Sequence, residues 1–283
     1  MHVGSSGAKI ERCLACTTIF DNDQDFRDVF TPVVKKYSRV VVTFSEASYI
    51  PVLCNWLSFA AKRNDVVVIA LDAIVYEYVR EKSLLTFFPH WKTRVGSLVK
   101  DWTLRLNFLM CLLQQYPGVL TIMSNVDALW VRDPVPMLLN SEHDDIVMSS
   151  GTYPADLAKS WHGKTGCMGF AGFRSSLAMR ETFLPLIVHM IERNESRDDQ
   201  VLVNMALKKL KINWRVNRGK LGGDLGEIQP SLHVQLIPYS FIVRHCTKGN
   251  ASQHPFILHC LSLKTADRKE SWMKSAGLWN PTC

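Results

Sequence analysis

The sequence predicts an α/β fold with one Rossmann-like mixed sheet and helices on both of its faces. Short runs rich in valine and isoleucine, typical of buried strands, alternate with longer stretches whose apolar residues recur at helical spacing. In the first half these elements follow one another as strand, helix, strand, helix, helix, strand, the order of an α/β sheet. Hydrophobic residues make up 47% of the 283 residues, which suits a sizeable core and excludes a disordered chain.

The first half of the chain supplies three of the predicted strands. They are expected at 40–44, 66–71 and 119–123, where β-branched runs are bounded by polar residues or turns. A helix is expected from about 48 to 60, a second helical stretch through Val79, and a third from Leu98. The third helix has an apolar stripe, which comprises Leu98, Trp102, Leu106, Leu109 and Leu113. Tyr116-Pro117-Gly118 ends that stripe.

The second half is less regular. Strands are expected at 146–148 and 169–173, followed by helices over about 175–192 and 198–210. Gly-rich turns at 219–226 precede a strand at 256–258 and a helix at 266–276, which Gly277 is well placed to end. We expect residues 1–37 to form a partly flexible N-terminal extension, and residues 38–283 to form one domain with an irregular second half.

Charge and motifs limit the classes of function that this chain can have. Lys plus Arg total 33 and Asp plus Glu 26, so the net charge is +7, spread along the chain. Such a bias suits an anionic ligand such as a nucleotide, but it equally suits a solvated surface. No nucleic-acid-binding module is recognisable, so we expect no nucleic acid partner. A dinucleotide dehydrogenase is excluded, because Ser45-Glu46-Ala47-Ser48 provides no glycine after the first strand.

Neither a membrane span nor a disulfide framework is predicted. The longest apolar runs are far shorter than the ~18 residues that a membrane-crossing helix needs. Eight cysteines are too few for a disulfide-built miniprotein in a chain of this length. Cys54 and Cys111 lie in apolar helical segments and are predicted to be buried thiols.

The end of the third strand carries the clearest candidate site. Ser124-Asn125-Val126-Asp127 is followed by an apolar stretch and Asp133-Pro134. Asn125 and Asp127 would point the same way, because alternate residues leave a strand on one side. A carboxylate at a strand end favours a Mg²⁺ or Mn²⁺ site that bridges to substrate phosphates. The alternative is that Asp127 only stabilises a turn.

This region resembles the DxD region of the nucleotide-diphospho-sugar transferase family, which includes plant pectin xylosyltransferases and related α-galactosyl and arabinosyl transferases. The resemblance extends over roughly residues 38–280. It includes 40–44, 55–57, 70–72, 102–105, 166–174, 198–204, His259, Lys264, Lys269 and 277–279. It implies a GT-A fold and a retaining transfer that depends on Mn²⁺ (or Mg²⁺). It also implies a nucleotide-sugar donor, with UDP-sugars favoured, and a hydroxyl acceptor on a glycan or glycoprotein.

The resemblance also assigns candidate residues. Asp127 and His259 would bind the metal, and Asp199 and Gln200 would act at the donor sugar and the anomeric centre. The donor-binding candidates are Thr43, Asp72, Arg105, Asn125 and Lys264. Structural alternatives stand beside several of these roles: Asp72 as a helix cap, His259 as a structural histidine, and Arg105 and Lys264 as surface charges.

Two departures from the family pattern leave a second hypothesis open. Asn125 stands where the family has the first DxD carboxylate, which should weaken metal binding. Cys167 or Met168, and Cys260, stand where the family commonly has asparagine. The alternative to an active transferase is therefore a catalytically degenerate protein that binds nucleotide or glycan without turnover. The resemblance favours the Golgi lumen if an N-terminal anchor has been removed; the cytoplasm is expected otherwise.

Overall fold

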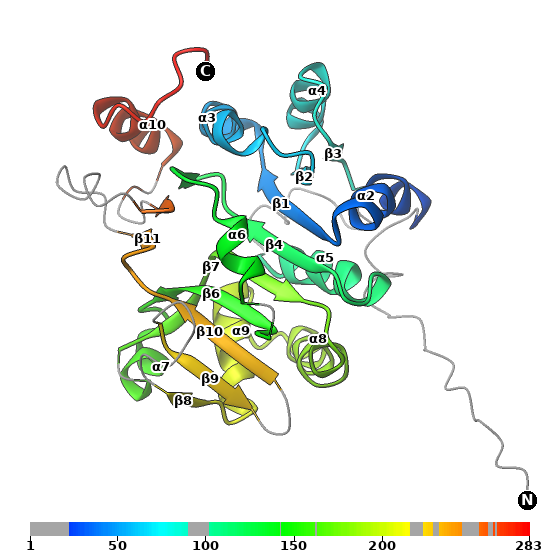
Figure 1. Ribbon diagram of the computed structural model, residues 1–283, viewed down its shortest axis with the longest axis vertical. Helices are drawn as coiled ribbons and strands as arrows, with labels where there is room; N and C mark the ends of the chain where they lie inside the picture. Colours follow the sequence, from blue (N-terminus) through cyan, green and yellow to red (C-terminus); the bar gives the residue numbers. More distant parts are fainter. Residues whose placement is uncertain are drawn as a thin grey trace, which may run out of the picture.

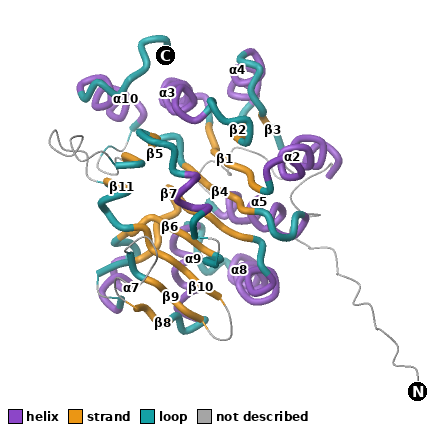
Figure 2. Tube along the Cα trace, in the orientation of Figure 1, coloured by secondary structure: helices purple, strands orange, loops and turns teal. Residues whose placement is uncertain are grey.

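A nine-stranded sheet forms the centre of the molecule (Figures 1 and 2). The computed structural model describes residues 23–89, 102–141, 143–161, 163–215, 223–228, 232–244, 255–259, 263 and 265–283. From one edge to the other, the strands are β3 (Thr86–Phe87), β2 (Val66–Ala70), β1 (Arg39–Ser45), β4 (Leu120–Ser124), β7 (Thr165–Arg174), β6 (Ile146–Gly151), β10 (Leu232–Ile237), β9 (Leu225–Ile228) and β8 (Asn213–Arg215). This is the α/β class with a mixed sheet that the sequence predicts.

The strand directions identify where a ligand is expected. Strands β3, β2, β1 and β4 are parallel, β7 is antiparallel to both β4 and β6, and β10 is parallel to β6. From β1 the chain continues to β2 and β3 on one side and then crosses to β4 on the other. The strand order therefore reverses between β1 and β4. In α/β sheets, ligands bind at the carboxyl ends of the strands at such a reversal.

Helices cover both faces of the sheet (Figure 1). Val40 and Val42 of β1 pack against the helices on one face of the sheet, and Val41 packs against the helices on the other face. Successive side chains of a strand point to opposite faces, so this alternation is expected. The first face carries α2 (Asp23–Tyr37), α5 (Thr103–Gln115), α8 (Leu184–Glu192) and α9 (Asp199–Lys209). The second carries α3 (Ile50–Ala60), α4 (Ala73–Glu81), α6 (Val135–Leu139) and α10 (Ala266–Ser275). The other helical elements among the described residues are the 3₁₀ turn η1 (Ala47–Tyr49), α7 (Ala155–Ser160) and the π turn η3 (Met179–Phe183).

A second, three-stranded sheet lies beside the end of β4. It has the order β11 (Ile242–Val243), β12 (Ile257–His259) and β5 (Ala128–Trp130). Strand β12 runs antiparallel to β5, and His259 pairs with Ala128. This pairing brings the end of β12 next to Asp127, a residue that is distant in sequence.

Most predicted elements are present with small shifts of their ends. The helix expected at 175–192 is interrupted by η3 before it continues as α8. Gly277 has a φ of +68° and ends α10 as predicted. The third helix, expected from Leu98, is described from Thr103 onward, because residues 90–101 lie outside the described part.

The predicted domain boundary at residue 38 leaves out a helix that belongs to the fold. Phe26 and Phe30 of α2 are fully buried, and their rings lie 5.5 and 5.4 Å from that of Phe108 on α5. Phe26, Phe30 and Val33 recur at spacings of four and three, so the apolar stripe was present in the sequence among charged residues. The expected extension is therefore folded from residue 23 onward, and residues 1–22 lie outside the described part.

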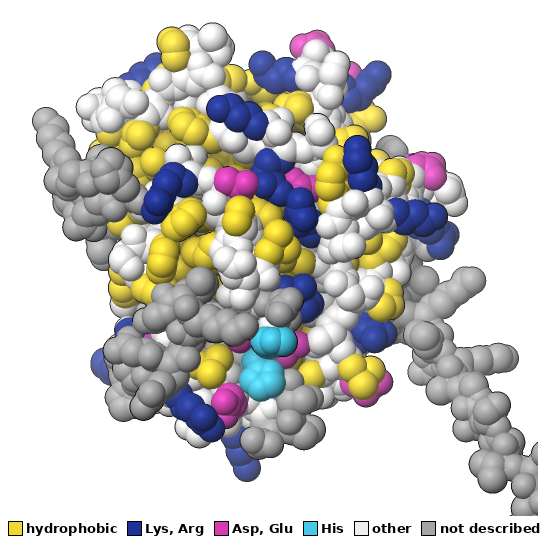
Figure 3. All heavy atoms as spheres, in the orientation of Figure 1, with side chains coloured by type: hydrophobic (Ala, Val, Ile, Leu, Met, Phe, Trp, Pro, Cys, Tyr) yellow, Lys and Arg dark blue, Asp and Glu magenta, His cyan; other side chains and the backbone are white. Residues whose placement is uncertain are grey.

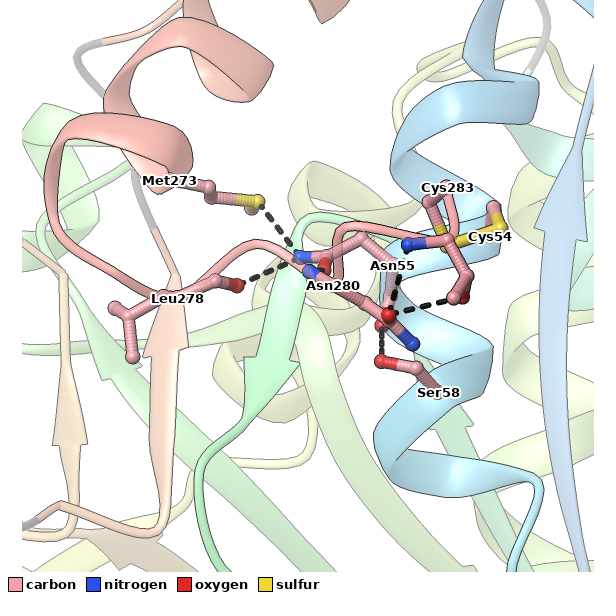
Figure 4. The surroundings of a disulfide bond; sticks show 8 residues. Cys54, Asn55, Ser58, Met273, Leu278, Asn280 and Cys283 are labelled. Atoms are coloured by element: carbon pink, nitrogen blue, oxygen red, sulfur yellow. Dashed lines mark hydrogen bonds between the residues drawn. A yellow bond between two sulfur atoms is a disulfide. The ribbon is translucent and has the colours of Figure 1, made fainter.

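The prediction that Cys54 is a free buried thiol is wrong. Cys54 on α3 forms a disulfide with Cys283, 229 residues later (Figure 4). Next to it, the Asn55 side chain donates to the carbonyl of Leu278 (3.1 Å) and accepts from the backbone N–H of Asn280 (2.8 Å). These bonds fix the segment after α10 to α3. Cys111 is a buried free thiol, as predicted.

The surface agrees with the even charge distribution of the sequence. Figure 3 shows Lys and Arg side chains dispersed over one face, with hydrophobic and acidic side chains between them. Among the helices of the described ranges, none has the length and apolar character to cross a membrane.

Candidate active site

A cavity of about 480 Å³ opens where β1 and β4 end, at the reversal of strand order. Its walls come from the ends of β1, β2 and β4, the starts of α5 and α9, the first half of β7, and the segment from β12 to α10. The lining comprises Phe44, Ser45, Glu46, Tyr49, Leu71, Trp102, Leu104, Arg105, Asn125, Val126, Asp127, Cys167, Met168, Gly169, Asp198, Asp199, Gln200, His259, Leu263 and Lys269. Polar side chains thus converge from six parts of the chain.

The loop after β4 presents Asn125 and Asp127 to this cavity. The backbone N–H of Asn125 donates to the carbonyl of Gly169 on β7 (2.8 Å), and its carbonyl accepts from Ala128 (2.9 Å), which closes a turn. This turn positions Asn125 partly exposed and Asp127 buried. The sequence therefore predicted correctly that both side chains face one site.

Asp127 lies between two basic side chains. Nζ of Lys269 is 2.8 Å from Oδ2, and Nε2 of His259 is 3.5 Å from Oδ1. Burial by itself would raise the pKa of Asp127, but His259 and Lys269 together hold it well below its ordinary value. The carboxylate also raises the pKa of Lys269, against the opposite effect of burial. Asp127 is therefore an ionised, fully paired carboxylate.

His259 fits its place only because its neighbour on β7 has no side chain. A β-carbon on Gly169 would lie 1.9 Å from Cε1 of the His259 ring. The ring is buried, and burial opposes its ionisation, yet Asp127 and then Cys167 raise the pKa of His259 to about 9. In turn, although burial opposes it, His259 lowers the pKa of the Cys167 thiol to about 7. From the sequence, Cys167 was a possible departure from the family pattern and had no assigned role.

Arg105 and Asp199 form a second buried pair in the lining of the cavity. Nε of Arg105 lies 3.3 Å from Oδ2 of Asp199, and neither atom has a hydrogen-bond partner among the described residues. The other end of the guanidinium donates to the carbonyl of Met168 (2.9 Å). Burial raises the pKa of Asp199, which the charge of Arg105 offsets only in part. Arg105 is therefore a site residue rather than a surface charge.

Gln200 and Asn204 connect α9 to β7. Gln200 lines the cavity, and its amide donates to the carbonyl of Tyr153 (2.7 Å). One turn later, Asn204 accepts from the N–H of Gly166 and donates to its carbonyl, both at 2.8 Å, and also donates to the carbonyl of Gln200 (2.7 Å). Asn204 thus fixes the start of α9, with Asp199 and Gln200, against the strand that bears Cys167.

Two predicted donor-binding residues do not line the cavity. Thr43 is fully buried inside β1, opposite Val68 of β2, and the strand ends two residues later. Asp72 is the N-cap of α4: it accepts from the backbone N–H of Val75 (2.9 Å) and from that of Ala47 (2.7 Å). Its interpretation as a helix cap is therefore confirmed. Lys264 lies outside the described residues.

Several cavity residues were missed from the sequence. Phe44, Ser45 and Glu46 follow from the rule that ligands bind at strand ends. Trp102 lies 5.3 Å from the Arg105 guanidinium, and its motif had been noted without a role. Lys269 belongs to the C-terminal stretch of the resemblance but had no role assigned, because its contact with Asp127 depends on how α10 packs.

The donor set does not fit a hard divalent cation. Within the described ranges, no group of three His, Cys, Asp or Glu side chains could hold a metal. In the loop 125–127 after β4, Asp127 is the one carboxylate, and both of its oxygens already face basic groups. Hard cations prefer several charged oxygen ligands. The Mn²⁺ (or Mg²⁺) cofactor stays a prediction, and this geometry weighs against it.

Comparison with known proteins identifies the family. A sequence model described as nucleotide-diphospho-sugar transferase matches residues 61–273, about three quarters of the chain. No curated protein sequence matches.

Solved structures give more distant likenesses. The glycosyltransferase GlyE of Streptococcus pneumoniae TIGR4 is similar at 12% identity and a TM-score of 0.47, covering 84% of this chain and 60% of GlyE. The apo form of GlyE is similar at 11% identity and a TM-score of 0.47, and the match covers 86% of this chain and 64% of GlyE. A putative glucose-1-phosphate thymidylyltransferase of Bacillus anthracis, in complex with a sucrose, is similar at 9% identity and a TM-score of 0.36. The match covers 60% of this chain and 83% of the thymidylyltransferase. The chain spans about three fifths of the GlyE length, and likenesses at these scores carry no information about the site. On the sequence match, this chain belongs to the nucleotide-diphospho-sugar transferase family of glycosyltransferases.

Proposed function

We propose that this protein transfers a sugar from a nucleotide-diphospho-sugar, a UDP-sugar, to a hydroxyl group of a glycan or glycoprotein with retention of configuration. One observation carries the proposal. In a chain of this family, the loop after β4, the start of α9 and Arg105 of α5 converge on one cavity at the reversal of strand order. A cavity of about 480 Å³ lies in the range of small-molecule sites.

The nucleoside would bind at the end of β1. Phe44 and Tyr49 offer aromatic surface there, while Ser45 and Glu46 offer polar groups for a base or ribose. Asn125, partly exposed at the end of β4, can donate from its amide to a ribose or phosphate oxygen. These residues take the roles first assigned to Thr43 and Asp72.

The sugar would lie against the start of α9. Gln200 can hydrogen-bond sugar hydroxyls, and Oδ2 of buried Asp199, which is ion-paired with Arg105 but accepts no hydrogen bond among the described residues, can accept from one. The Arg105 guanidinium, whose Nε makes no hydrogen bond among the described residues, can donate to a phosphate oxygen. The acceptor hydroxyl would attack from the side on which the nucleoside diphosphate departs, and Asp199 and Gln200 would stabilise the positively charged sugar between the two.

Asn125 favours one alternative, a degenerate transferase that binds nucleotide or glycan without turnover. It removes a charged oxygen from the position where this family carries the first DxD carboxylate. The two functions differ in one observable, because only an enzyme releases free nucleotide from its donor.

The experiment is donor hydrolysis and transfer with purified protein and a panel of UDP- and GDP-sugars, scoring free nucleotide. Release from one donor, abolished by Asp199→Asn and retained by the surface variant Lys274→Ala, would support the transferase. The anomeric configuration of the product, determined by NMR, tests retention. Binding of UDP with no release from any donor or acceptor would favour the degenerate alternative.

A further inference from the structure

Lys269 places a positive charge in the cavity beside Asp127. Its side chain is 9% exposed, lines the cavity, and has its ammonium 2.8 Å from Oδ2 of Asp127. The ring of Tyr49 lies 5.1 Å from the same nitrogen. An ammonium has three donors, so after the bond to Asp127 it can still donate to a phosphate oxygen.

The position of Lys269 is built into the fold. Thr265 caps α10, and Met273 of the same helix is fully buried against the second face. The segment after α10 is fixed to α3 by Asn55 and by the Cys54–Cys283 disulfide (Figure 4). The Lys269 ammonium therefore lies on a helix that is held in place at both ends. Electrostatic preorganisation requires a charge whose position is fixed in this way.

The neighbouring charges complete the argument. Asn125 is uncharged, so Asp127 carries the negative charge that the loop after β4 presents to the cavity. The positive charge of Lys269 faces this carboxylate. A divalent cation brought to Asp127 would meet this ammonium at close range, which at short distance in a buried site is strongly unfavourable. The carboxylate that this loop presents to the cavity is therefore already neutralised by an internal cation.

We propose that the Lys269 ammonium supplies the positive charge that neutralises the leaving nucleoside diphosphate, so that donor binding and turnover need no divalent cation. This inference rests on the proposed sugar transfer. In that step the bond between the anomeric carbon and the β-phosphate oxygen breaks, and its electron pair goes to that oxygen. The acceptor oxygen bonds to the anomeric carbon, and its proton passes to the departing phosphate oxygen. Lys269 and Arg105 stabilise the charge that develops on the diphosphate.

The test measures UDP binding by calorimetry in chelator and in Mn²⁺, and Mn²⁺ binding to the protein alone by electron paramagnetic resonance. For the wild type we expect UDP affinity equal within about twofold in the two conditions, and no Mn²⁺ bound. Lys269→Ala should weaken UDP binding by about tenfold or more, corresponding to about 1.4 kcal/mol. Lys269→Arg, which keeps the charge, should recover part of the affinity that Lys269→Ala loses. Lys274→Ala, on the exposed side of the same helix, should bind UDP like the wild type.

A gain-of-metal variant sharpens the test. Asn125→Asp combined with Lys269→Ala should bind UDP in Mn²⁺ and lose it in chelator. Wild-type UDP binding that falls about tenfold in chelator, or Mn²⁺ binding by the wild-type protein, would overturn the role of Lys269 while leaving sugar transfer intact. Absence of UDP binding in both conditions would instead overturn the proposed function and the inference that rests on it. Circular dichroism of each variant controls for folding.

Discussion

Gly169 and His259 lie in such close contact that a β-carbon on the glycine would stand 1.9 Å from Cε1 of the imidazole. Real β-carbons do not approach other atoms so closely, so any side chain at 169 must move the ring or the strand. His259 belongs to the small sheet and Gly169 to the large one. The contact therefore sets where the two sheets meet at the site.

Gly169→Ala should displace His259 and lower donor turnover by about 100-fold, because misplacements of about 1 Å have effects of this size. The measurement is nucleotide release together with circular dichroism. Gly172→Ala on the same strand is the matched control, since its β-carbon would meet Leu138 at 3.4 Å, close to an ordinary contact. Equal activity of the two variants would contradict the role of this contact.

Asn204→Ala should lower the free energy of unfolding by about 3 kcal/mol. It removes three hydrogen bonds, at about 1 kcal/mol each, and leaves both backbone groups of Gly166 without this partner. Urea denaturation measures the change, with the exposed Asn213→Ala as control. A loss of less than about 1 kcal/mol would show that water replaces the amide.

Replacing Cys54 and Cys283 by serine should lower the free energy of unfolding by about 2–5 kcal/mol, because the disulfide closes a loop across 229 positions. Reducing agent should lower the stability of the wild-type protein by a similar amount and leave the double variant unchanged. Since the bond braces the segment after α10, we also expect weaker UDP binding in the double variant. A reductant effect of equal size on both proteins would mean that another thiol is responsible.

Phe30→Ala should lower the free energy of unfolding by about 3–5 kcal/mol, as for other buried phenylalanines. Phe30 is fully buried between the rings of Phe26, Phe87 and Phe108. The exposed Lys35→Ala on the same helix should have little effect. If both variants unfold like the wild type, the domain begins at residue 38 after all.

Stability should fall as the pH rises toward 9. Asp127 raises the pKa of His259 to about 9 from an unfolded value near 6.5, despite the opposite effect of burial. A group whose pKa is raised on folding stabilises the folded state below its unfolded pKa and loses that contribution as the pH passes its folded pKa. We therefore expect the contribution of His259 to the free energy of unfolding to be lost between pH 6.5 and 9, while the lowered pKa of Cys167 offsets part of this loss above pH 7.

His259→Gln, which cannot titrate, should flatten this part of the profile. Chemical denaturation across the pH range measures both proteins. An unchanged slope in the variant would assign the dependence to groups other than His259. Cys167 is not one of them, because its lowered pKa makes stability rise over this range.

Sequence pattern was sufficient for the parts of this protein that depend on neighbours along the chain. The runs at 40–44, 66–71 and 119–123 form strands, and the stripes on α3 and α9 form helices, because burial periodicity is a local property. The same reasoning brought Asn125 and Asp127 to one side of a strand end. The motifs also identified the family and gathered Arg105, Asp199, Gln200 and His259 at one site.

Only the tertiary structure decided which candidate site residues contact one another and which charges lie beside them. Asp72 and Thr43 have side chains suited to donor binding, but one caps α4 and the other lies inside β1. The pairs Cys54–Cys283, Gly169–His259 and Asp127–Lys269 join positions 229, 90 and 142 residues apart. Such contacts leave no periodic trace, because they depend on how helices and sheets pack rather than on the conformation of either segment. The sequence therefore determined the fold class, the family and the loop that carries the site, whereas packing determined that the carboxylate of this loop faces a lysine.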